Sequence, residues 1–453
     1  MLKKLLVLSA IAASTVGVTQ AQSLEERVEA LEYAGYENWW SFSGSLEYRY
    51  DTVETTHNKA YTTNTFNGTS VARTAGEKNS AKHHRVFTEL DMAATPSKKL
   101  SFYGRLAMTK YMNTLNKGGG SYIGDGAFNE LGEGQGADNS KVFFERAFVN
   151  YSFTENLTFT VGRLPTIDGA PKHFQEGRPM MGQYPLLVFG GVFDGMALTY
   201  ANSHNGHAFK FRGIYTPFNQ RDIGVTHKPM SNTAGQDIKE NVDAYSLMAE
   251  YEKTNMSWAR RIHLIYQYLH FGGLDAFTNP NASTAQASST TNFNVTRHVL
   301  NLEMNGIANT GLSLGFSYLM GNIKGTGDFQ TLGTWYGTSN TDLDGDAWIA
   351  NLNYEMPFQV LRKAILGFEY INSDDDVFLY DTTAKNKVGL YTGRGGKSMH
   401  VFWMQPIDQN FKFRVGYQKS ENKKTNFLGG YVGTPIVIDD EATAFYSSLQ
   451  FNF

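Results

Sequence analysis

The last twelve residues of the chain alternate between apolar and polar side chains. In "ATAFYSSLQFNF", Phe445, Leu449, Phe451 and Phe453 fall on one side of an extended strand, and the intervening residues fall mostly on the other. A period of two predicts a β-strand. The same period begins at Trp40 in "WSFSGSLEYRY", where aromatic and apolar residues alternate with Ser, Glu and Arg. Both ends of this region are therefore predicted to be strands.

The alternating pattern recurs along the chain and predicts about sixteen strands of about ten residues each, the length that a tilted strand needs to cross a bilayer. The strands are expected to begin near Trp40, Arg85, Leu100, Phe143, Leu157, Gly195, Phe209, Asp243, Arg261, Val295, Leu312, Ala347, Ala364, Ser398, Phe411 and Ala442.

Short and long connections between these strands alternate. Short turns such as "TPSKK", "TEN" and "IDQN" are separated by long polar loops such as "NTLNKGGGSYIGDGAFNELGEGQGADNS". This alternation is typical of an outer-membrane barrel, which has short periplasmic turns and long external loops. The sequence therefore predicts an all-β fold, a transmembrane antiparallel β-barrel over residues 38–453 with both ends on the periplasmic side. The last strand would close the barrel against the first, so no strand edge is left in lipid.

Residues 1–21 have the pattern of a secretory signal peptide: Lys3 and Lys4, an apolar stretch, and small residues before a cleavage site. Residues 22–36 are expected to form a short periplasmic helix, because Leu24, Val28 and Leu31 are spaced four and then three apart, as in a heptad seam. This helix is too short to be stable alone. It either joins a coiled coil with neighbouring chains or is a solvated linker.

Composition excludes several functions. Without Lys3 and Lys4, 38 of the 40 basic residues remain against 43 acidic residues, so nothing indicates a nucleic-acid partner. Cysteine is absent, which excludes disulfides and thiol chemistry. The sequence has no G-x-S-x-G, H-E-x-x-H or phosphate-binding glycine motif, so we expect no catalytic residues and no enzyme activity.

Charged residues at alternate strand positions predict a water-filled lumen, because charges in this number would be very costly in lipid. They hold the wall together in pairs, set a field for solutes, or do both. The acidic residues are Glu47, Glu89, Asp91, Glu250, Glu303, Glu355 and Glu369. The basic residues are Arg49, Arg85, Arg105, Arg146, Lys210, Arg212, Arg261, Arg297, Lys412 and Arg414.

The sequence resembles bacterial outer-membrane porins over nearly the whole mature chain. The terminal Phe453 looks like the signal that the barrel-assembly machinery reads, and "FFERAFVNYSFTENLTFTVGRLP" is similar to a strand–turn–strand segment of sixteen-stranded porins. The leading "SLEERVEALE" looks like the periplasmic coiled coil of some porin families, whose members are often trimers. The resemblance implies a homotrimer in the outer membrane of a Gram-negative cell, in contact with lipid and with small hydrophilic solutes.

In sixteen-stranded porins the third external loop folds inward and narrows the pore. Here that loop is "LPTIDGAPKHFQEGRPMMGQYPLLVFGG", which carries four prolines and several apolar residues that would be poorly placed in water. Its charged residues are Asp168, Lys172, Glu176 and Arg178, beside His173. Packed against Arg49, Arg85, Arg105 and Arg146, the loop would form a constriction with weak anion preference. Alternatively, its apolar residues contact a neighbouring subunit.

The favoured function is passive diffusion of small hydrophilic solutes. A substrate-selective channel, a barrel enzyme and a loop-mediated adhesin or receptor are the alternatives. No cofactor is expected, with one weak metal candidate: Asp342, Asp344 and Asp346 in "DLDGD" are a calcium site or an acidic, solvated loop tip.

If Leu24, Val28 and Leu31 form a seam between chains, Val28→Asp combined with Leu31→Asp should weaken the trimer, because carboxylates would face the seam. Each barrel should stay folded. The measurement is the mass of the assembly in mild detergent, compared with the wild type. An unchanged mass would show that the helix does not determine assembly.

Overall fold

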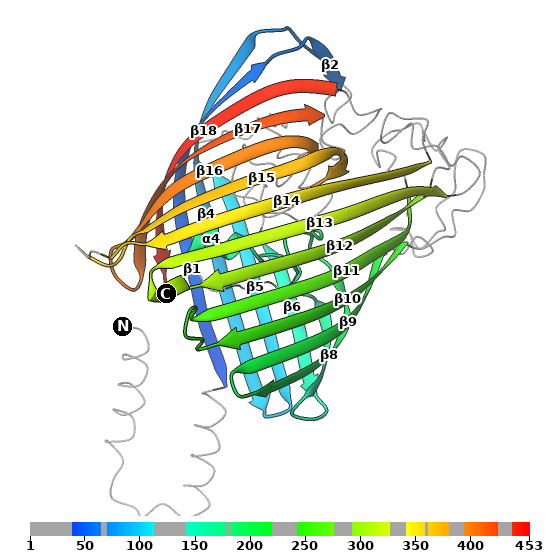
Figure 1. Cartoon of the computed structure of the whole chain (residues 1–453), viewed down its shortest axis with the longest axis vertical. Helices are drawn as coiled ribbons and strands as arrows, with labels where there is room; N and C mark the ends of the chain where they lie inside the picture. The colour runs from blue at the N-terminus through cyan, green and yellow to red at the C-terminus, as the bar shows by residue number, and fades with distance from the viewer. Residues whose placement is uncertain are drawn as a thin grey trace, which may run out of the picture.

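The computed structural model describes residues 39–64, 70–112, 142–177, 180, 182, 184–219, 242–275, 292–326, 341–357, 361–379, 394–424 and 437–453. Sixteen antiparallel strands form a closed barrel in the order β1, β18 and then each preceding strand down to β4 (Figure 1). The predicted fold class is confirmed. The expected signal peptide (1–21) and short helix (22–36), with Leu24, Val28 and Leu31, lie outside the described residues.

The barrel strands are longer than expected at several positions. Their bounds are β1 Trp40–His57, β4 Glu77–Ser97, β5 Leu100–Tyr111, β6 Phe143–Ser152, β7 Leu157–Arg163, β8 Asp194–His204, β9 His207–Asn219, β10 Val242–Thr254, β11 Arg261–Asp275, β12 Asn292–Asn305, β13 Leu312–Thr326, β14 Asp342–Glu355, β15 Ile365–Phe378, β16 Arg394–Pro406, β17 Phe411–Lys424 and β18 Val437–Asn452. A separate two-stranded sheet joins β2, Tyr61–Asn64, to β3, Ser70–Arg73.

The short helical elements are α4, Lys172–Glu176, and the 3₁₀ helix η2, Ile307–Asn309. Within the residues that the structure describes, no helix is long and apolar enough to cross a membrane.

The barrel closes where β1 pairs with β18. Gly44 and Phe453 exchange two backbone hydrogen bonds, with N···O distances of 2.9 and 3.0 Å. A strand that ends on Phe453 is therefore paired through its last residue. The position of Gly44 also requires a residue without a side chain, because a Cβ there would clash with the carbonyl oxygen of Glu89 and lie 2.6 Å from Cζ of Phe453.

Side chains alternate between the two faces of the wall, as the sequence pattern predicts. On β10, Tyr245 and Leu247 are exposed on the outer face, whereas Ala244, Ser246 and Met248 are buried on the inner face. On other strands, outer-face residues such as Phe211 of β9 and Phe445 of β18 are likewise apolar and exposed. A barrel with this pattern presents an apolar surface outside and its polar and charged residues inside.

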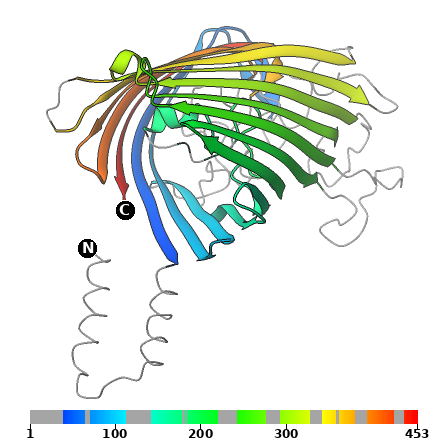
Figure 2. The ribbon, with the colours of Figure 1, turned by 60° about the horizontal axis from the view of Figure 1, so that its bottom comes forward.

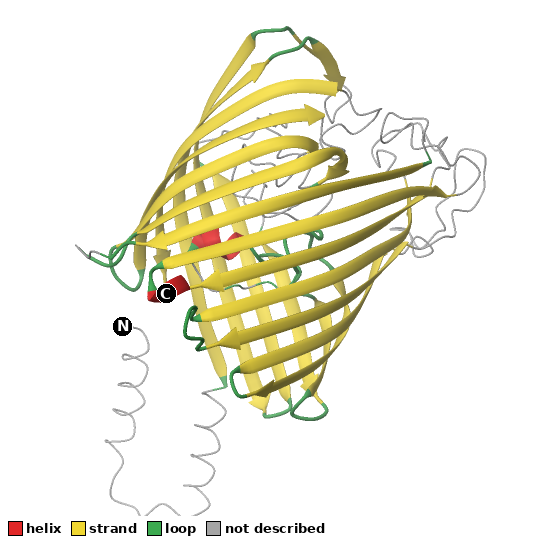
Figure 3. Ribbon diagram, viewed as in Figure 1, coloured by secondary structure: helices red, strands yellow, loops and turns green. Residues whose placement is uncertain are grey.

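Short and long connections alternate around the barrel. The short ones cover residues 98–99, 153–156, 205–206, 255–260, 306–311, 356–364 and 407–410, all at the end of the barrel where β1 begins and β18 ends. The third long connection, between β7 and β8, folds into the lumen of the barrel. Figures 2 and 3 show its helix α4 inside the barrel. Most of the described residues between 164 and 193 are buried.

The contact at Gly44 predicts that Gly44→Val impairs barrel closure. The added side chain would overlap Glu89 and Phe453, and overpacking of this kind costs about 1–3 kcal/mol. Gly213→Val on β9 is the matched control, because its nearest contact would be Leu247 Cδ2 at 4.0 Å. We expect a lower urea midpoint and less heat-modifiable, folded barrel for Gly44→Val only. Equal folding of both variants would contradict the importance of this contact.

Candidate channel constriction

The segment between β7 and β8 forms a tight hairpin inside the barrel. The amide of Gly182 donates a hydrogen bond of 3.0 Å to the carbonyl oxygen of Asp168, and the amide of Leu186 donates one of 2.7 Å to Ala170. Glycine is required at 169 and 182, because a Cβ at either position would clash with the carbonyl of Tyr184 or Ile167. We call the described residues of this connection, 164–177, 180, 182 and 184–193, the inward segment.

Asp168 anchors the first part of the inward segment to the wall. Its carboxylate lies 2.8 Å from Nη1 of Arg105 on β5, 3.0 Å from Nη2 of Arg146 on β6 and 2.9 Å from Nζ of Lys172 in α4. All four side chains are almost completely buried. A buried carboxylate needs such partners, because burial of an unpaired charge is strongly unfavourable.

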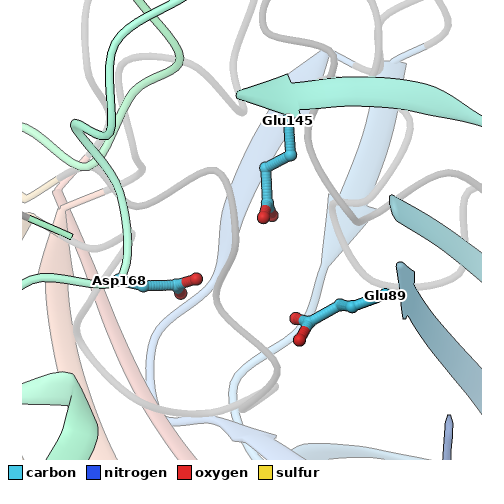
Figure 4. Close-up of side chains that lie close together, drawn as sticks. All are labelled: Glu89, Glu145 and Asp168. Atoms are coloured by element: carbon cyan, nitrogen blue, oxygen red, sulfur yellow. The ribbon is translucent and has the colours of Figure 1, made fainter. Parts of the chain in front are cut away.

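Glu89, Glu145 and Asp168 lie close together, with one oxygen of each within 4.8 Å of the others (Figure 4). The guanidinium of Arg105 lies among them: its Nη1 is 3.7 Å from Glu89, 3.3 Å from Glu145 and 2.8 Å from Asp168. The same side chain also binds Asp91 with Nε at 2.7 Å and Nη2 at 3.0 Å. Protein cations therefore already compensate this cluster of carboxylates.

The helix α4 is held by two other strands of the barrel, β15 and β17. Arg414 and Lys412 of β17 donate hydrogen bonds to the carbonyl oxygens of Gln175 and Glu176, the latter at 2.6 Å. Gln175 in turn donates to both carboxylate oxygens of Glu369 on β15 at 2.7 Å.

The first turn of α4 contacts two more strands. His173 lies 3.2 Å from Glu303 on β12, and Asn353 of β14 donates a 2.9 Å hydrogen bond to the carbonyl of Phe174. The inward segment therefore crosses the whole lumen, since Asp168 contacts β5 and β6.

The last part of the inward segment is apolar. Leu186, Leu187 and Val188 belong to one buried cluster with lumen-facing side chains such as Leu269 and Val299. Arg297 on β12 donates hydrogen bonds to the carbonyls of Leu187 and Val188 at 3.3 and 2.8 Å.

Tyr184 lies in the same apolar cluster. Burial raises the pKa of its hydroxyl, so the side chain remains neutral. The part of the lumen around this apolar cluster is a packed core, whereas the interior of a water-filled barrel is typically polar.

A second group of charges lies on β1, β4 and β17. Asp51 binds Nε of Arg49 at 2.9 Å and Nη2 of Arg85 at 2.6 Å, and all three side chains are buried. The guanidinium carbon of Arg49 lies 3.8 Å from the ring centre of Tyr446, a cation–π contact. Arg414 binds Glu47 at 3.2 Å.

The structure brings together part of the predicted site. Arg105, Arg146, Asp168 and Lys172 form one cluster, whereas Arg49, Arg85 and Arg414 lie in the second group. Glu176 is buried at the end of α4, and Arg178 lies outside the described residues.

The remaining predicted arginines lie farther around the wall. Arg212 binds Glu250 at 3.0 Å, and Arg297 binds the inward segment. Arg261 binds Glu252 at 2.6 Å while about one third of its side chain is exposed.

Two buried acidic residues of these two charge clusters were missed by the sequence analysis. Asp51 continues the alternation of Glu47 and Arg49, so extension of the first strand by a few residues would have found it. Glu145 and its neighbour Arg146 are both buried because the register between β5 and β6 shifts between Arg105 and Leu106. Strict alternation places only one of the two side chains in the lumen. The sequence signal that could have indicated the bulge is the pair of adjacent charged residues within "FFERAF".

The calcium candidates lie along β14. Asn322 of β13 donates hydrogen bonds to Asp342 at 2.6 Å and to Asp344 at 2.8 Å, and Tyr318 donates one of 2.7 Å to Asp346. Alternation along β14 puts these three carboxylates on the face opposite the buried Leu343 and Ala347. Calcium binding there stays a prediction.

The fold and the inward segment define a sixteen-stranded antiparallel β-barrel with a segment folded across its lumen. The family model described as "Protein of unknown function (DUF3373)" matches residues 76–451, and the chain belongs to this family. No curated protein matches the sequence.

Three solved structures are similar to this chain. OmpF of Salmonella typhi, in complex with daunomycin, has 13% identity over 91% of this chain and 97% of its own, with a TM-score of 0.47. OprB of Pseudomonas putida has 13% identity, 94% and 96% coverage, and a TM-score of 0.49. The anion-selective porin from Comamonas acidovorans has 9% identity, 91% and 99% coverage, and a TM-score of 0.48.

The buried position of Asp168 predicts that Asp168→Asn releases the inward segment. The substitution keeps the shape but removes the negative charge that Arg105, Arg146 and Lys172 share, and loss of one partner of a buried ion pair costs about 3–5 kcal/mol. We expect a lower urea midpoint and faster trypsin cleavage after Lys172.

Asp194→Asn is the control for this prediction. Its carboxylate binds Arg163 at 2.9 Å, but its side chain is 62% exposed, so the pair contributes only about 0–1 kcal/mol. The same cleavage rate and urea midpoint for both variants would contradict an anchoring role of Asp168.

Proposed function

We propose that this protein is an outer-membrane channel for the passive diffusion of small hydrophilic solutes in a Gram-negative cell. The observation that carries the proposal is the inward segment, which crosses the lumen of a closed barrel and is held by buried polar contacts on both sides. A segment in this place sets the narrowest part of any path through the barrel.

The distribution of side chains supports a position in the membrane. Outward-facing residues such as Phe42, Phe211 and Leu247 are largely exposed in the isolated chain, whereas arginines and carboxylates point inward. Exposed apolar surface of this extent is stabilised by lipid, and the inward charges avoid the cost of contact with hydrocarbon.

Charge pairing in the lumen bears on the expected selectivity. The basic excess expected from the sequence becomes smaller once Asp51 and Glu145 are counted among the lumen-facing residues. Each of the two also binds an arginine directly. We therefore propose weak ion selectivity, and the anion preference expected from the sequence stays a prediction to be tested by the reversal potential in a salt gradient.

We also propose that the channel is a homotrimer. Strand β7 has only 7 residues, fewer than the roughly 9–11 that a tilted strand needs to cross the hydrocarbon layer. Its outer face ends at the ion pair of Arg163 with Asp194, which is poorly suited to contact with lipid tails. A neighbouring subunit would cover the outer face of the barrel wall at this short strand.

A substrate-selective channel is the second candidate, and the tight packing around the inward segment favours it. The buried cluster of Leu186, Leu187 and Val188 leaves the polar side of the lumen as the path for solutes. A saturable block of the ion current by one solute would distinguish a selective channel from a general one.

Deletion of Thr166 to Gly177 should increase single-channel conductance and reduce ion selectivity, because it removes α4, Asp168 and Lys172 from the lumen. The measurement is conductance and reversal potential in a planar bilayer. Heat-modifiable migration equal to that of the wild type would show that the variant is folded. Unchanged conductance of such a folded variant would place the constriction elsewhere.

A further inference from the structure

Four neighbouring strands place two distinct rows of side chains on the inner wall, just below the inward segment on the side of the short turns. The register across β1, β4, β5 and β6 aligns Ser41, Ala93, Tyr103 and Phe148 in the lower row. The upper row aligns Ser43, Asp91, Arg105 and Arg146. Small residues therefore stand beside two aromatic rings, and a charged row lies directly above them.

A cavity of about 530 Å³ lies against these two rows, and Pro165 and Met180 of the inward segment also line it. Small-molecule sites have volumes of about 300–1,000 Å³ and combine apolar walls with a few polar groups. This cavity has both features.

The aromatic part of the wall offers a flat face. The rings of Tyr103 and Phe148 are stacked, with centroids 5.5 Å apart and an angle of 27° between their planes. Phe148 is 8% exposed, but Tyr103 is 41% exposed although it points into the lumen. An aromatic ring exposed in this way is suited to stack against an apolar face of a ring-shaped solute.

The polar part of the wall is rich in hydrogen-bonding groups but nearly neutral. Asp91 is paired with Arg105 at 2.7 Å, and Arg146 is paired with Asp168 at 3.0 Å. Asn150 completes the polar wall. Its Nδ2 donates to Ser101 at 3.3 Å and its Oδ1 accepts from Thr160 at 2.7 Å, and the amide nitrogen carries a second hydrogen that can be donated to a solute. Since each charge already has a partner, a charged solute would gain little, whereas hydroxyl groups could donate to Asp91 and accept from Asn150.

We infer that this cavity binds a neutral, ring-shaped polyhydroxylated solute of the sugar class, with its apolar face on Tyr103 and its hydroxyl groups toward Asp91 and Asn150. The inference rests on the proposed channel function, in which the cavity would be the last binding site before the periplasm.

The test is calorimetric binding to the full-length protein folded in detergent, with methyl α-D-glucopyranoside and maltose as probes. Glycerol serves as the acyclic polyol, and sodium gluconate serves as the acyclic anion. We expect saturable binding of at least one of the two sugars and none of glycerol or gluconate. Tyr103→Ser should weaken sugar binding about five- to tenfold, and Tyr103→Phe should keep it within about threefold, because the ring face remains.

Tyr200→Ser is the matched control, because Tyr200 is 45% exposed on the outer face of β8 near the same end of the barrel. Its sugar binding should equal that of the wild type. Equal loss in Tyr200→Ser and Tyr103→Ser, unchanged binding in Tyr103→Ser, or binding of gluconate in place of the sugars would each overturn the site.

Binding and conduction are separate readouts, so the two proposals can fail separately. If the protein conducts ions in a planar bilayer but shows no saturable sugar binding, the channel proposal is supported and the sugar site is refuted. If a folded protein binds sugar through Tyr103 but conducts no ions, the sugar site is supported and the channel proposal is refuted.

Discussion

Backbone pairing between β1 and β18 is the interaction on which the rest of the structure depends. A strand edge in hydrocarbon would leave its amide and carbonyl groups unpaired, so the sheet must close, and here it closes through Gly44 and Phe453. Closure creates an enclosed inner face. Only on that face can arginines and carboxylates be buried in the numbers seen here, and only there can a loop be held from both sides.

The charged side chains on the inner face bind mainly one another and the inward segment. Arg105 contacts carboxylates from β4, β6 and the inward segment, which links three parts of the chain at one guanidinium. Elsewhere on the wall, cationic side chains of β12 and β17 donate hydrogen bonds to carbonyl oxygens of the segment. The position of the segment therefore depends on its backbone as much as on its charged residues.

The sequence was sufficient for the architecture because the signals were local and repeated. Alternation of side chains, short turns and the terminal Phe453 predicted the strand number and the closure. The inward position of the third long connection was implied by the resemblance to sixteen-stranded porins. The site was predicted only in part. The register shift that turns both Glu145 and Arg146 inward depends on pairing between β5 and β6, and the apolar packing of Leu186 to Val188 depends on strands far away in the chain. Neither is visible in a local pattern.

The close backbone contacts at Gly169 and Gly182 limit how the inward segment can move within the lumen. The two arms of the inward segment touch backbone to backbone, so they are clamped together and cannot slide past each other residue by residue. Any displacement would carry the hairpin as one body and break its contacts with both walls together. Current through a single barrel would then step between a small number of discrete levels, with no continuum of intermediate widths.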